Sequence, residues 1–344
     1  MHPALTLGIA IVAVALLLAT RASARRALDA TLEWCDVQLA RFERRPIIIA
    51  GMLLAVPVTL VTVFSFFPLL YAVYISLFDT RRGTYIALGN YHRALADPEF
   101  WRSVKVTLYY AIGAVPLTIV LSFVVAWLLF RITRFRSLFR TVYFLPYVTS
   151  AVAAATVWRV LLRPQSGFVN VMLVSVGLEP QKWLIEPRSV FHLITGGAIP
   201  ADVGPSLALC CIIAFDIWHS SGFMIVVFLA GLSAIPRQLE ETARLDGAST
   251  FGVVRYVTIP LLSPTIFFLV IVSAIKSFQA FNSFYALVNA RGEDTQNLIV
   301  YIYAQFYENQ HIGYGASIAV IMCVAIVLLT IAQWRIAGRQ VYYE

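Results

Sequence analysis

Charged residues are scarce in this sequence. Only 13% of the 344 residues are charged, against about 25% in ordinary soluble domains, whereas 60% are hydrophobic. Lysine is the rarest charged residue and occurs at Lys105, Lys182 and Lys276. None of the three follows a glycine in the Gly-Lys-Ser/Thr order of a phosphate-binding loop. The sequence therefore excludes such an ATP-binding loop on this chain.

Cysteine and histidine are also sparse and scattered. Cys35, Cys210, Cys211 and Cys323 lack the spacing of a disulfide framework or a zinc site, and we expect them to act as small buried apolar residues. The five histidines lie far apart, and no Ser-His-Asp set accompanies them. We therefore expect no catalytic residues and no metal site on this chain.

Long hydrophobic runs account for the missing charge. A helix needs roughly 20 apolar residues to cross a bilayer. Runs suited to membrane spans cover residues 4–20, 47–77, 104–130, 139–162, 206–232, 265–288 and 314–336. Ala22-Ser23-Ala24, after the first run, loosely fits a signal-peptide cleavage site, but basic residues follow the run rather than precede it. We expect a retained span, and a removed or interfacial segment is the alternative.

The basic residues that give the net charge of +8 are distributed as the expected topology requires. If the spans alternate in direction, most arginines fall on one side of the membrane, and the positive-inside rule makes that side the cytoplasm. The C-terminus is then cytoplasmic, and the basic balance does not indicate a nucleic-acid partner. These arginines are Arg21, Arg25, Arg26, Arg41, Arg44, Arg45, Arg131, Arg134, Arg136, Arg140, Arg237, Arg244, Arg255, Arg335 and Arg339.

The cytoplasmic segment 236–261, here called the elbow, is the most informative part of the sequence. Pro236 precedes a run of helix formers, and Gly247 stands where helix C-termini favour glycine. A second helical piece follows, before Pro260 and Pro264 mark the return to the membrane. The pattern predicts a helix–Gly–helix bend.

The elbow resembles the signature of the permease subunits of binding-protein-dependent ABC importers. That signature reads Glu-Ala-Ala, three residues, Gly, nine residues, Ile, one residue, Leu-Pro. The positions that carry the resemblance here are Glu241, Thr242, Ala243, Asp246, Gly247, Val257, Ile259 and Pro260. Within this family, the chain resembles the sugar importers most. Among those it looks like the first of the two permeases, as in the maltose-type importer and its glycerol-phosphate relative. It departs at residues 290–293, where Ala-Arg-Gly-Glu replaces a Thr-Gly-Gly-Pro turn.

The resemblance implies an all-α polytopic membrane protein. Residues 46–344 would form a six-helix permease domain with the elbow as its coupling helix, after an N-terminal span and an amphipathic cytoplasmic segment in residues 1–45. The family pairs such a chain with a second permease, two copies of a cytoplasmic ATPase that bind ATP and Mg²⁺, and an extracytoplasmic substrate-binding protein. The expected location is the bacterial inner membrane, and this chain itself needs no cofactor.

The resemblance also assigns roles within the elbow. Glu241 would pair with a basic residue of the ATPase, and Gly247 would permit the bend. A short rigid helix that its partner rotates could then move both flanking spans. The expected coupling residues are Glu241, Ala243, Asp246, Gly247 and Pro260.

Polar residues inside two spans predict a substrate cavity. Ionisable residues within a membrane usually face a cavity or a partner, and Asp216 and Ser220, four residues apart, share a helix face. By family position, the resemblance implies that Asp216, Ser220, Phe223, Ser273, Lys276 and Ser277 bind substrate. Trp218, as an aromatic face, and the polar neighbours Gln279 and Asn282 complete the expected set. Asp216 and Lys276 would flank the ligand or pair with each other when the cavity is empty. Hydrogen bonds between helices are the alternative.

The substrate stays open at this stage. A carbohydrate leads, with aromatic faces for its apolar side, and glycerol phosphate or another polyol is the alternative because Lys276 could meet a phosphate. From other classes, an ion-coupled secondary transporter would show inverted repeats, and a membrane enzyme would show acidic or histidine clusters. The sequence shows neither feature.

Two loops opposite the elbow carry local patterns. Residues 167–173 predict a short surface helix. Residues 298–306 contain Tyr301, Tyr303 and Phe306, aromatics suited to the lipid headgroup level or to a docking surface.

Overall fold

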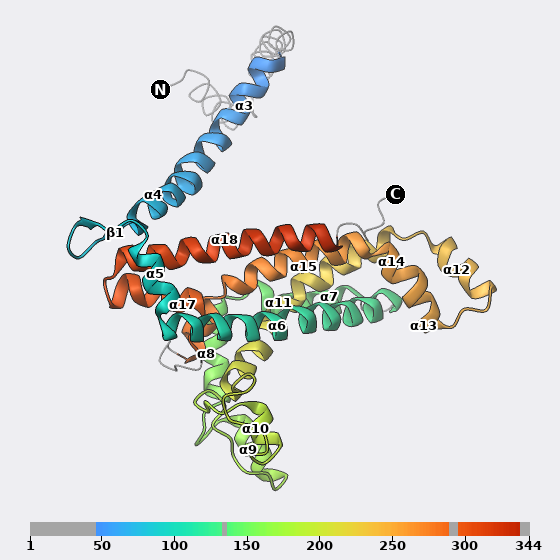
Figure 1. Ribbon diagram of the computed structural model, residues 1–344. Coiled ribbons are helices and arrows are strands. Elements are labelled where there is room, and N and C mark those ends of the chain that lie inside the picture. Colours follow the sequence, from blue (N-terminus) through green and yellow to red (C-terminus); the bar gives the residue numbers. More distant parts are fainter. Residues whose placement is uncertain (1–45, 133–135, 289–294, 338–344) are drawn as a thin grey trace, which may run out of the picture. The chain divides into compact units, whose positions relative to one another are not determined.

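The computed structural model describes residues 46–132, 136–288 and 295–337, and this part of the chain is mostly helical (Figure 1). It divides into two compact units, Met1–Tyr71 and Ala72–Glu344. The predicted span at 4–20 and the amphipathic segment that follows it lie outside the described residues.

The first unit contains α3 (Pro46–Val61), the π-helical turn η1 (Thr62–Phe66) and the beginning of α4 (Phe67–Ser76). Its described side chains are exposed within the isolated chain, including Leu53 at 71% and Phe64 at 73%. A helix that is apolar on all sides suits a lipid environment or a partner subunit.

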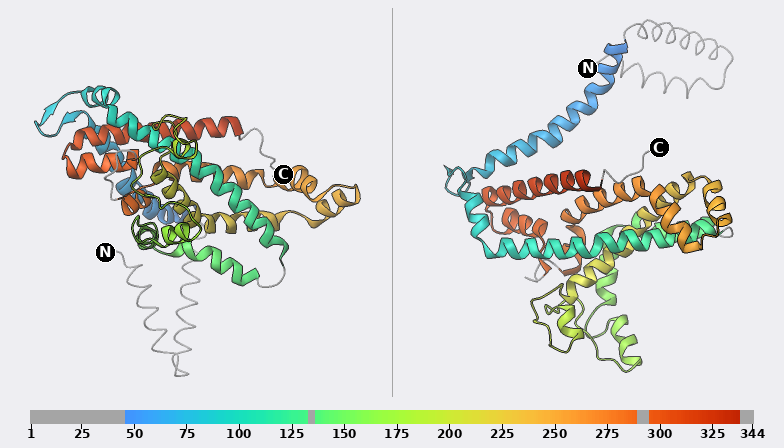
Figure 2. Two further views of the ribbon diagram at one scale, coloured as in Figure 1. Left: turned by 90° about the horizontal axis from the view of Figure 1, so that it is seen from below. Right: turned by 45° about the vertical axis from the view of Figure 1, so that its right-hand side comes forward.

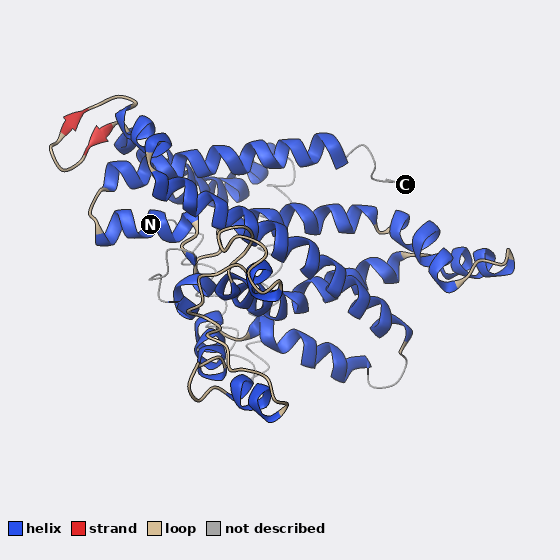
Figure 3. Cartoon of the chain, turned by 60° about the horizontal axis from the view of Figure 1, so that its bottom comes forward, coloured by secondary structure: helices blue, strands red, loops and turns tan. Residues whose placement is uncertain are grey.

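Long helices form the centre of the second unit: α6 (Pro98–Arg131), α11 (Leu207–Ala234) and α18 (Ile312–Ala337). Each of the first two begins at a side-chain cap, because Asp97 accepts from Glu99 N–H and Ser206 accepts from Leu209 N–H. Helix α6 packs against α11 and α15 (Ser263–Phe278). The β1–β2 hairpin and the elbow lie at opposite ends of this bundle in all views (Figures 1, 2 and 3).

Glycine permits the closest helix contact. A Cβ added at Gly222 of α11 would overlap the Tyr143 carbonyl oxygen and lie 3.0 Å from Phe144 Cα, both in α7 (Arg136–Val148). Since those are backbone atoms, they cannot move aside as a side chain can. Helices α7 and α11 can therefore meet at this distance only with glycine at position 222.

Two membrane segments are bent rather than straight. Helix α7 meets α8 (Ala151–Leu161) at 94°, and the helical segment Thr250–Leu261 meets α15 at 68°. The prediction of one continuous helix over 139–162 is therefore wrong: Pro146 lies in the last turn of α7, and Ser150 leaves the helical conformation to begin α8. Over the described residues, these pairs and the four long apolar helices supply up to six spans, as the expected six-helix core requires.

The predicted span at 265–288 is also interrupted. Helix α15 ends at Phe278, and α16 begins only at Asn282. The remaining elements are short: β1 (Phe78–Asp79), β2 (Thr84–Tyr85), α5 (Gly89–Ala96), α9 (Phe168–Ser175), α10 (Val190–Ile194), α16 (Asn282–Val288), α17 (Leu298–Tyr303) and η4 (Ala304–Glu308). The two strands pair antiparallel, with Phe78 opposite Tyr85.

Residues 163–206 form a small lobe that contains α9 and α10, so the predicted short helix is confirmed. Its centre is the buried Asn170, whose amide donates to the carbonyls of Pro164 and Gln181 at 2.9 and 2.8 Å. The Asn170 Oδ1 accepts from Gln181 N–H and Trp183 Nε1–H. Every hydrogen-bonding position of this side chain is thus used, which joins the two ends of the loop.

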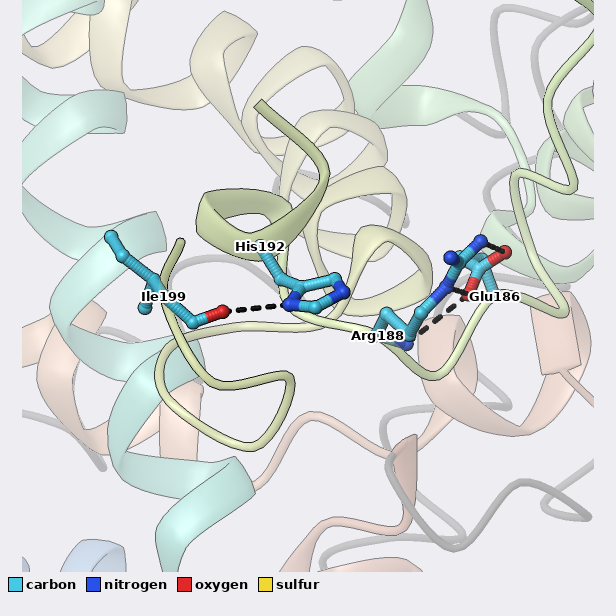
Figure 4. A network of polar contacts seen from close by, with 4 residues as sticks. All are labelled: Glu186, Arg188, His192 and Ile199. Carbon is cyan, nitrogen blue, oxygen red and sulfur yellow. Dashed lines mark hydrogen bonds and ion pairs between the residues drawn. The ribbon is translucent and has the colours of Figure 1, made fainter. Parts of the chain in front are cut away.

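Ionic and polar contacts support the second half of the same lobe (Figure 4). The Arg188 guanidinium donates to both carboxylate oxygens of Glu186, at 2.6 and 3.0 Å, and this contact lowers the pKa of Glu186. His192 Nδ1 lies 2.6 Å from the Ile199 carbonyl oxygen. The lobe is therefore ordered by polar contacts more than by a large apolar core.

The aromatic segment at 298–306 packs inside the bundle. Tyr301 is 4% exposed, and its hydroxyl donates to Asp97 Oδ2 at 2.6 Å, as does the Tyr314 hydroxyl. Tyr301 is therefore packed against protein rather than exposed at a docking surface, because the partly buried Asp97 carboxylate holds its hydroxyl. Burial alone would raise the pKa of Asp97, but the hydrogen bonds from the two tyrosines outweigh it and lower this pKa.

Replacing Asp97 with asparagine is expected to destabilise the protein by about 1–3 kcal/mol, because an amide NH₂ would face two hydroxyl donors. Since the folded-state pKa lies below its ordinary value of 3.8, the stabilisation is complete above about pH 5 and is lost as pH falls through the folded-state pKa. Thermal unfolding of the purified complex at pH 7 measures the loss. The control is Asp202→Asn, an exposed residue of the 163–206 lobe. Equal unfolding temperatures for native and Asp97→Asn protein would refute the prediction.

Candidate functional site

A cavity of about 270 Å³ lies among α6, α11 and α15, and the end of α7, the start of α8 and the break before α16 complete its wall. The structure brings eight of the nine expected substrate residues to its lining: Asp216, Ser220, Phe223, Ser273, Lys276, Ser277, Gln279 and Asn282. Whether they bind a substrate stays a prediction.

Trp218 is the expected residue that does not line the cavity. Its ring packs 5.7 Å from that of Trp158 and 6.1 Å from that of Phe215, and 41% of the side chain is exposed. Two residues beyond Asp216 correspond to about 200° around a helix. Trp218 therefore points away from the face that Asp216 and Ser220 share.

Asp216 is held by hydroxyl groups from other helices. The Tyr110 hydroxyl of α6 donates to Asp216 Oδ2 at 2.7 Å, and the Ser283 side chain of α16 is a second hydrogen-bond partner. Both partners line the same cavity. The carboxylate thus ties three helices together at the cavity wall, and a conformational change that separates those helices must break these bonds.

Lys276 lies on a different part of the wall, against aromatic rings. Its ammonium is 5.1 Å from the centroid of the Phe223 ring and 5.8 Å from that of Tyr147, within the range of a cation–π contact. These two rings stack on each other at 5.4 Å. In the described parts of the chain, Lys276 forms no ion pair with Asp216, so the structure shows the two charges apart rather than paired.

Several lining residues were not predicted. They come from α6, from the end of α7, from the middle of α11, from the break at 279–281 and from the start of α16, and they are Tyr110, Thr118, Tyr147, His219, Phe281 and Ser283. Tyr110 and Thr118 lie eight residues apart on one face of α6, a polar spacing that the sequence did contain. Nothing local in the sequence indicates Tyr147, because it faces the cavity only through the bend between α7 and α8.

The break after α15 contributes polar groups to the cavity. Gln279 leaves the helical path at φ −98° and ψ 12°, and the next helix begins at Asn282. The Ala280 carbonyl within the break accepts from Asn297 Nδ2 at 2.6 Å, which satisfies a group that the helix no longer pairs. Non-helical backbone at membrane depth is tolerated where it lines a cavity in this way.

The elbow folds as the sequence predicts. Helix α12 (Arg237–Leu245) follows Pro236, and Gly247 adopts φ +85°. The N–H groups of Gly247 and Ala248 bond to the carbonyls of Arg244 and Ala243, the two contacts of a Schellman motif. Ser249 then caps α13 (Thr250–Val253), which continues through η2 (Val254–Thr258) into α14 (Ile259–Leu261). The elbow is therefore two helical pieces around a left-handed glycine.

The elbow presents an exposed surface beyond the bundle (Figure 1). Apolar side chains on it are strongly exposed: Leu239 42%, Leu245 88%, Phe251 72% and Tyr256 75%. Glu241 and Asp246 are also exposed, and Pro260 lies in α14. Exposed apolar side chains gathered on a short element are typical of an interaction surface.

The described residues contain no group of three or more His, Cys, Asp or Glu side chains that could hold a metal ion. The chemistry available at the cavity is therefore hydrogen bonding, one carboxylate, one ammonium and aromatic faces. This arrangement can bind a polar ligand.

Comparison with known proteins relates this architecture to transporters. Residues 100–340 match the family described as binding-protein-dependent transport system inner membrane component. The lactose transport permease of Rhizobium radiobacter is 30% identical, over 83% of this chain and 93% of that protein. The trehalose/maltose transport permease of Thermococcus litoralis is 28% identical, over 83% and 92% respectively.

Two further comparisons agree. The sn-glycerol-3-phosphate transport permease of Agrobacterium fabrum is 27% identical, over 86% of this chain and 97% of that protein. The crystal structure of a bacterial ABC transporter that imports alginate contains a chain with the same fold, with a TM-score of 0.72 and 20% identity, over 88% of this chain and 99% of that one. This protein belongs to the family of binding-protein-dependent transport system inner membrane components, and is an integral membrane permease subunit of an ABC importer rather than an enzyme.

Proposed function

We propose that this chain is one of two permease subunits of an ATP-driven importer for a carbohydrate. The observation that carries the proposal is the cavity among α6, α11 and α15, which combines hydroxyl, amide and aromatic groups. A sugar needs many hydrogen-bond partners and a flat apolar surface, and the stacked rings of Tyr147 and Phe223 supply the latter. Relatives named for lactose and for trehalose and maltose support the same substrate class.

The elbow is the proposed contact with a cytoplasmic ATPase. Its exposed apolar residues and Glu241 would enter a cleft on that partner, so that closure of the ATPase rotates α12 and moves α11 and α15 on either side of it. Gly247 and Asp246 would keep the bend, Ala243 would leave room for the close approach, and Pro260 would direct the chain back to the membrane. ATP and Mg²⁺ would bind to the ATPase dimer.

The remaining assembly follows from the same proposal. A second permease would complete the pathway, and an extracytoplasmic binding protein would deliver the ligand. One solved alginate transporter was crystallised together with its ligand-bound periplasmic protein. With the arginine-rich segments in the cytoplasm, the elbow and the C-terminus would face the cytoplasm and the 163–206 lobe the opposite side. Residues 1–45 would add an N-terminal span and an amphipathic segment to the permease domain of residues 46–344.

The proposal is tested by measuring ATP hydrolysis of the complete complex in liposomes. The complex is purified with the proteins encoded beside it, and its binding protein is loaded in turn with sugars, polyol phosphates and amino acids. Stimulation by a carbohydrate supports the proposal. A response to amino acids alone, or transport that continues without ATP, would refute it.

Asp216→Asn is expected to lower transport about tenfold in this system, because loss of the charge weakens the bonds from Tyr110 and Ser283 and any bond to a ligand hydroxyl. Membrane insertion and subunit assembly should be unchanged, since asparagine has nearly the same volume. Asp202→Asn, outside the cavity, is the matched control. Uptake at the native rate by Asp216→Asn would remove this residue from the proposed site.

A further inference from the structure

Lys276 has an unusual electrostatic setting. It lies in α15, part of the bent helix pair that is long and apolar enough to form one membrane span, and its side chain lines the cavity. Its Nζ lies over the rings of Phe223 and Tyr147, at 5.1 and 5.8 Å from their centroids. Aromatic faces attract a cation but carry no charge. Lys276 is exposed in this chain, so its ammonium is open to the cavity and can meet a charged group of a ligand.

The carboxylate of the same cavity is engaged elsewhere. Asp216 Oδ2 accepts the Tyr110 hydroxyl at 2.7 Å, and Ser283 is a further partner. In the described residues no oxygen of Asp216 lies within 4.0 Å of the Lys276 ammonium, the limit for an ion pair. The cavity also contains His219, whose Nε2 contacts the Thr149 carbonyl oxygen at 3.3 Å. The cavity thus presents a cation without a bonded anion.

The neighbours of Lys276 indicate what kind of ligand could carry an anionic group to it. Ser273 and Ser277 flank it on α15, and the side chains of Gln279 and Asn282 follow at the break. These groups suit hydroxyls rather than a second acid. The cavity has a volume of about 270 Å³, close to the lower end of the range for small-molecule sites, about 300–1,000 Å³.

We propose that the transported ligand carries an acidic group, a carboxylate or a phosphate, that binds the Lys276 ammonium while its hydroxyls meet the surrounding serine and amide side chains. The ligand is then a sugar acid or a sugar or polyol phosphate. This inference rests on the proposed import of a carbohydrate and narrows it to acidic members. The apolar face of the ligand lies against Phe223 and Tyr147, which keeps the acid beside Lys276.

The first experiment uses pairs of ligands that differ only in the acid. Calorimetry measures binding of galactose and galacturonate, glucose and glucose 1-phosphate, and glycerol and glycerol 3-phosphate to the binding protein of this importer. Each bound ligand is then tested for stimulation of ATP hydrolysis by the complex in liposomes. Comparison of galacturonate with the two phosphates distinguishes a ligand carboxylate from a ligand phosphate. Stimulation by an acidic member and not by its neutral counterpart is expected.

The second experiment tests whether Lys276 recognises the acidic group of the ligand. Lys276→Met, of similar length without charge, is expected to reduce stimulation by the acidic ligand about tenfold and to raise its KM, whereas Lys276→Arg retains most of it. Co-purification of the ATPase and of the second permease with each variant shows intact assembly. Lys182→Met, an exposed lysine of the 163–206 lobe, is the control and should behave as the native protein does.

The outcomes separate this inference from the proposed function. If neutral sugars stimulate the complex as well as their acids do, or if Lys276→Met responds as the native protein does, the inference is wrong and sugar import stands. If the binding protein binds no carbohydrate or polyol phosphate and the complex responds only to another class, both are wrong. Stimulation by an acid that depends on the charge at position 276 supports both.

Discussion

ATP-driven uptake is expected to fall to near background when Gly247 is replaced with valine. Gly247 holds φ +85°, a conformation that a β-branched residue adopts only with strain, and no heavy atom lies within 4 Å of an added Cβ. The effect of the substitution is therefore confined to the backbone, at about 1–2 kcal/mol or more for an L-residue in the left-handed region. The strain is relieved when the bend opens, which rotates α12 away from α13 and changes the surface offered to the ATPase.

A series of substitutions at this position separates strain from size. Asparagine tolerates the left-handed region better than other side chains, so Gly247→Asn should retain most uptake, Gly247→Ala should be intermediate, and Gly247→Val should be lowest. Co-purification of the ATPase with the permease measures docking, and uptake into liposomes measures coupling. Glu241→Ala should weaken the same co-purification without opening the bend. Full uptake by Gly247→Val would contradict a coupling role for the elbow.

Substitution of Gly222 with valine is expected to separate two helices of the bundle. Any Cβ at this position meets the backbone of Tyr143 and Phe144, so α11 must move away from α7. Overpacking of this kind typically costs about 1–3 kcal/mol. The shift also disturbs the cavity, since Phe223 follows directly and stacks on Tyr147 across the same helix pair at 5.4 Å. Loss of both stability and transport is therefore expected.

The matched control for this variant is another helical glycine. An added Cβ at Gly51 in α3 meets nothing within 4 Å. Gly51→Ala should leave stability unchanged or raise it by up to about 1 kcal/mol, the helix-propensity difference, whereas Gly222→Ala should lower it. Thermal unfolding of the purified complex and the yield of assembled complex give the comparison. If both alanine variants unfold at the native temperature, the backbone contact between α7 and α11 does not limit the fold.

Much of the fold could be predicted because its determinants are local. Hydrophobic runs of sufficient length specify membrane helices, and the positions of Pro236, Gly247 and Pro260 specify the elbow, whose helices and left-handed glycine the structure confirms. The shapes of two spans were not predictable in the same way. A hydropathy run across residues 139–162 looks the same for a straight helix and for one bent by 94° at its middle.

Some residues of the candidate cavity could likewise be predicted from local sequence, and others could not. Asp216, Ser220 and Lys276 could be found from the sequence, because polar side chains within apolar helices are costly and three- or four-residue spacing places them on one face. The partners of these residues could not be found. Tyr110 reaches Asp216 across 106 positions of sequence, and Tyr147 faces the cavity only because α7 and α8 diverge.

The sequence by itself determined that the chain spans a membrane, where the elbow lies and which helices carry the polar residues. The reason is that solvent transfer, helix periodicity and glycine or proline conformations act over a few neighbouring residues. Only the tertiary structure decided that Tyr110 and Ser283 bond to Asp216, that Lys276 meets aromatic rings instead of a carboxylate, that Trp218 turns away from the cavity and that Tyr301 is buried against Asp97. Those contacts depend on how distant helices pack, which no local pattern records.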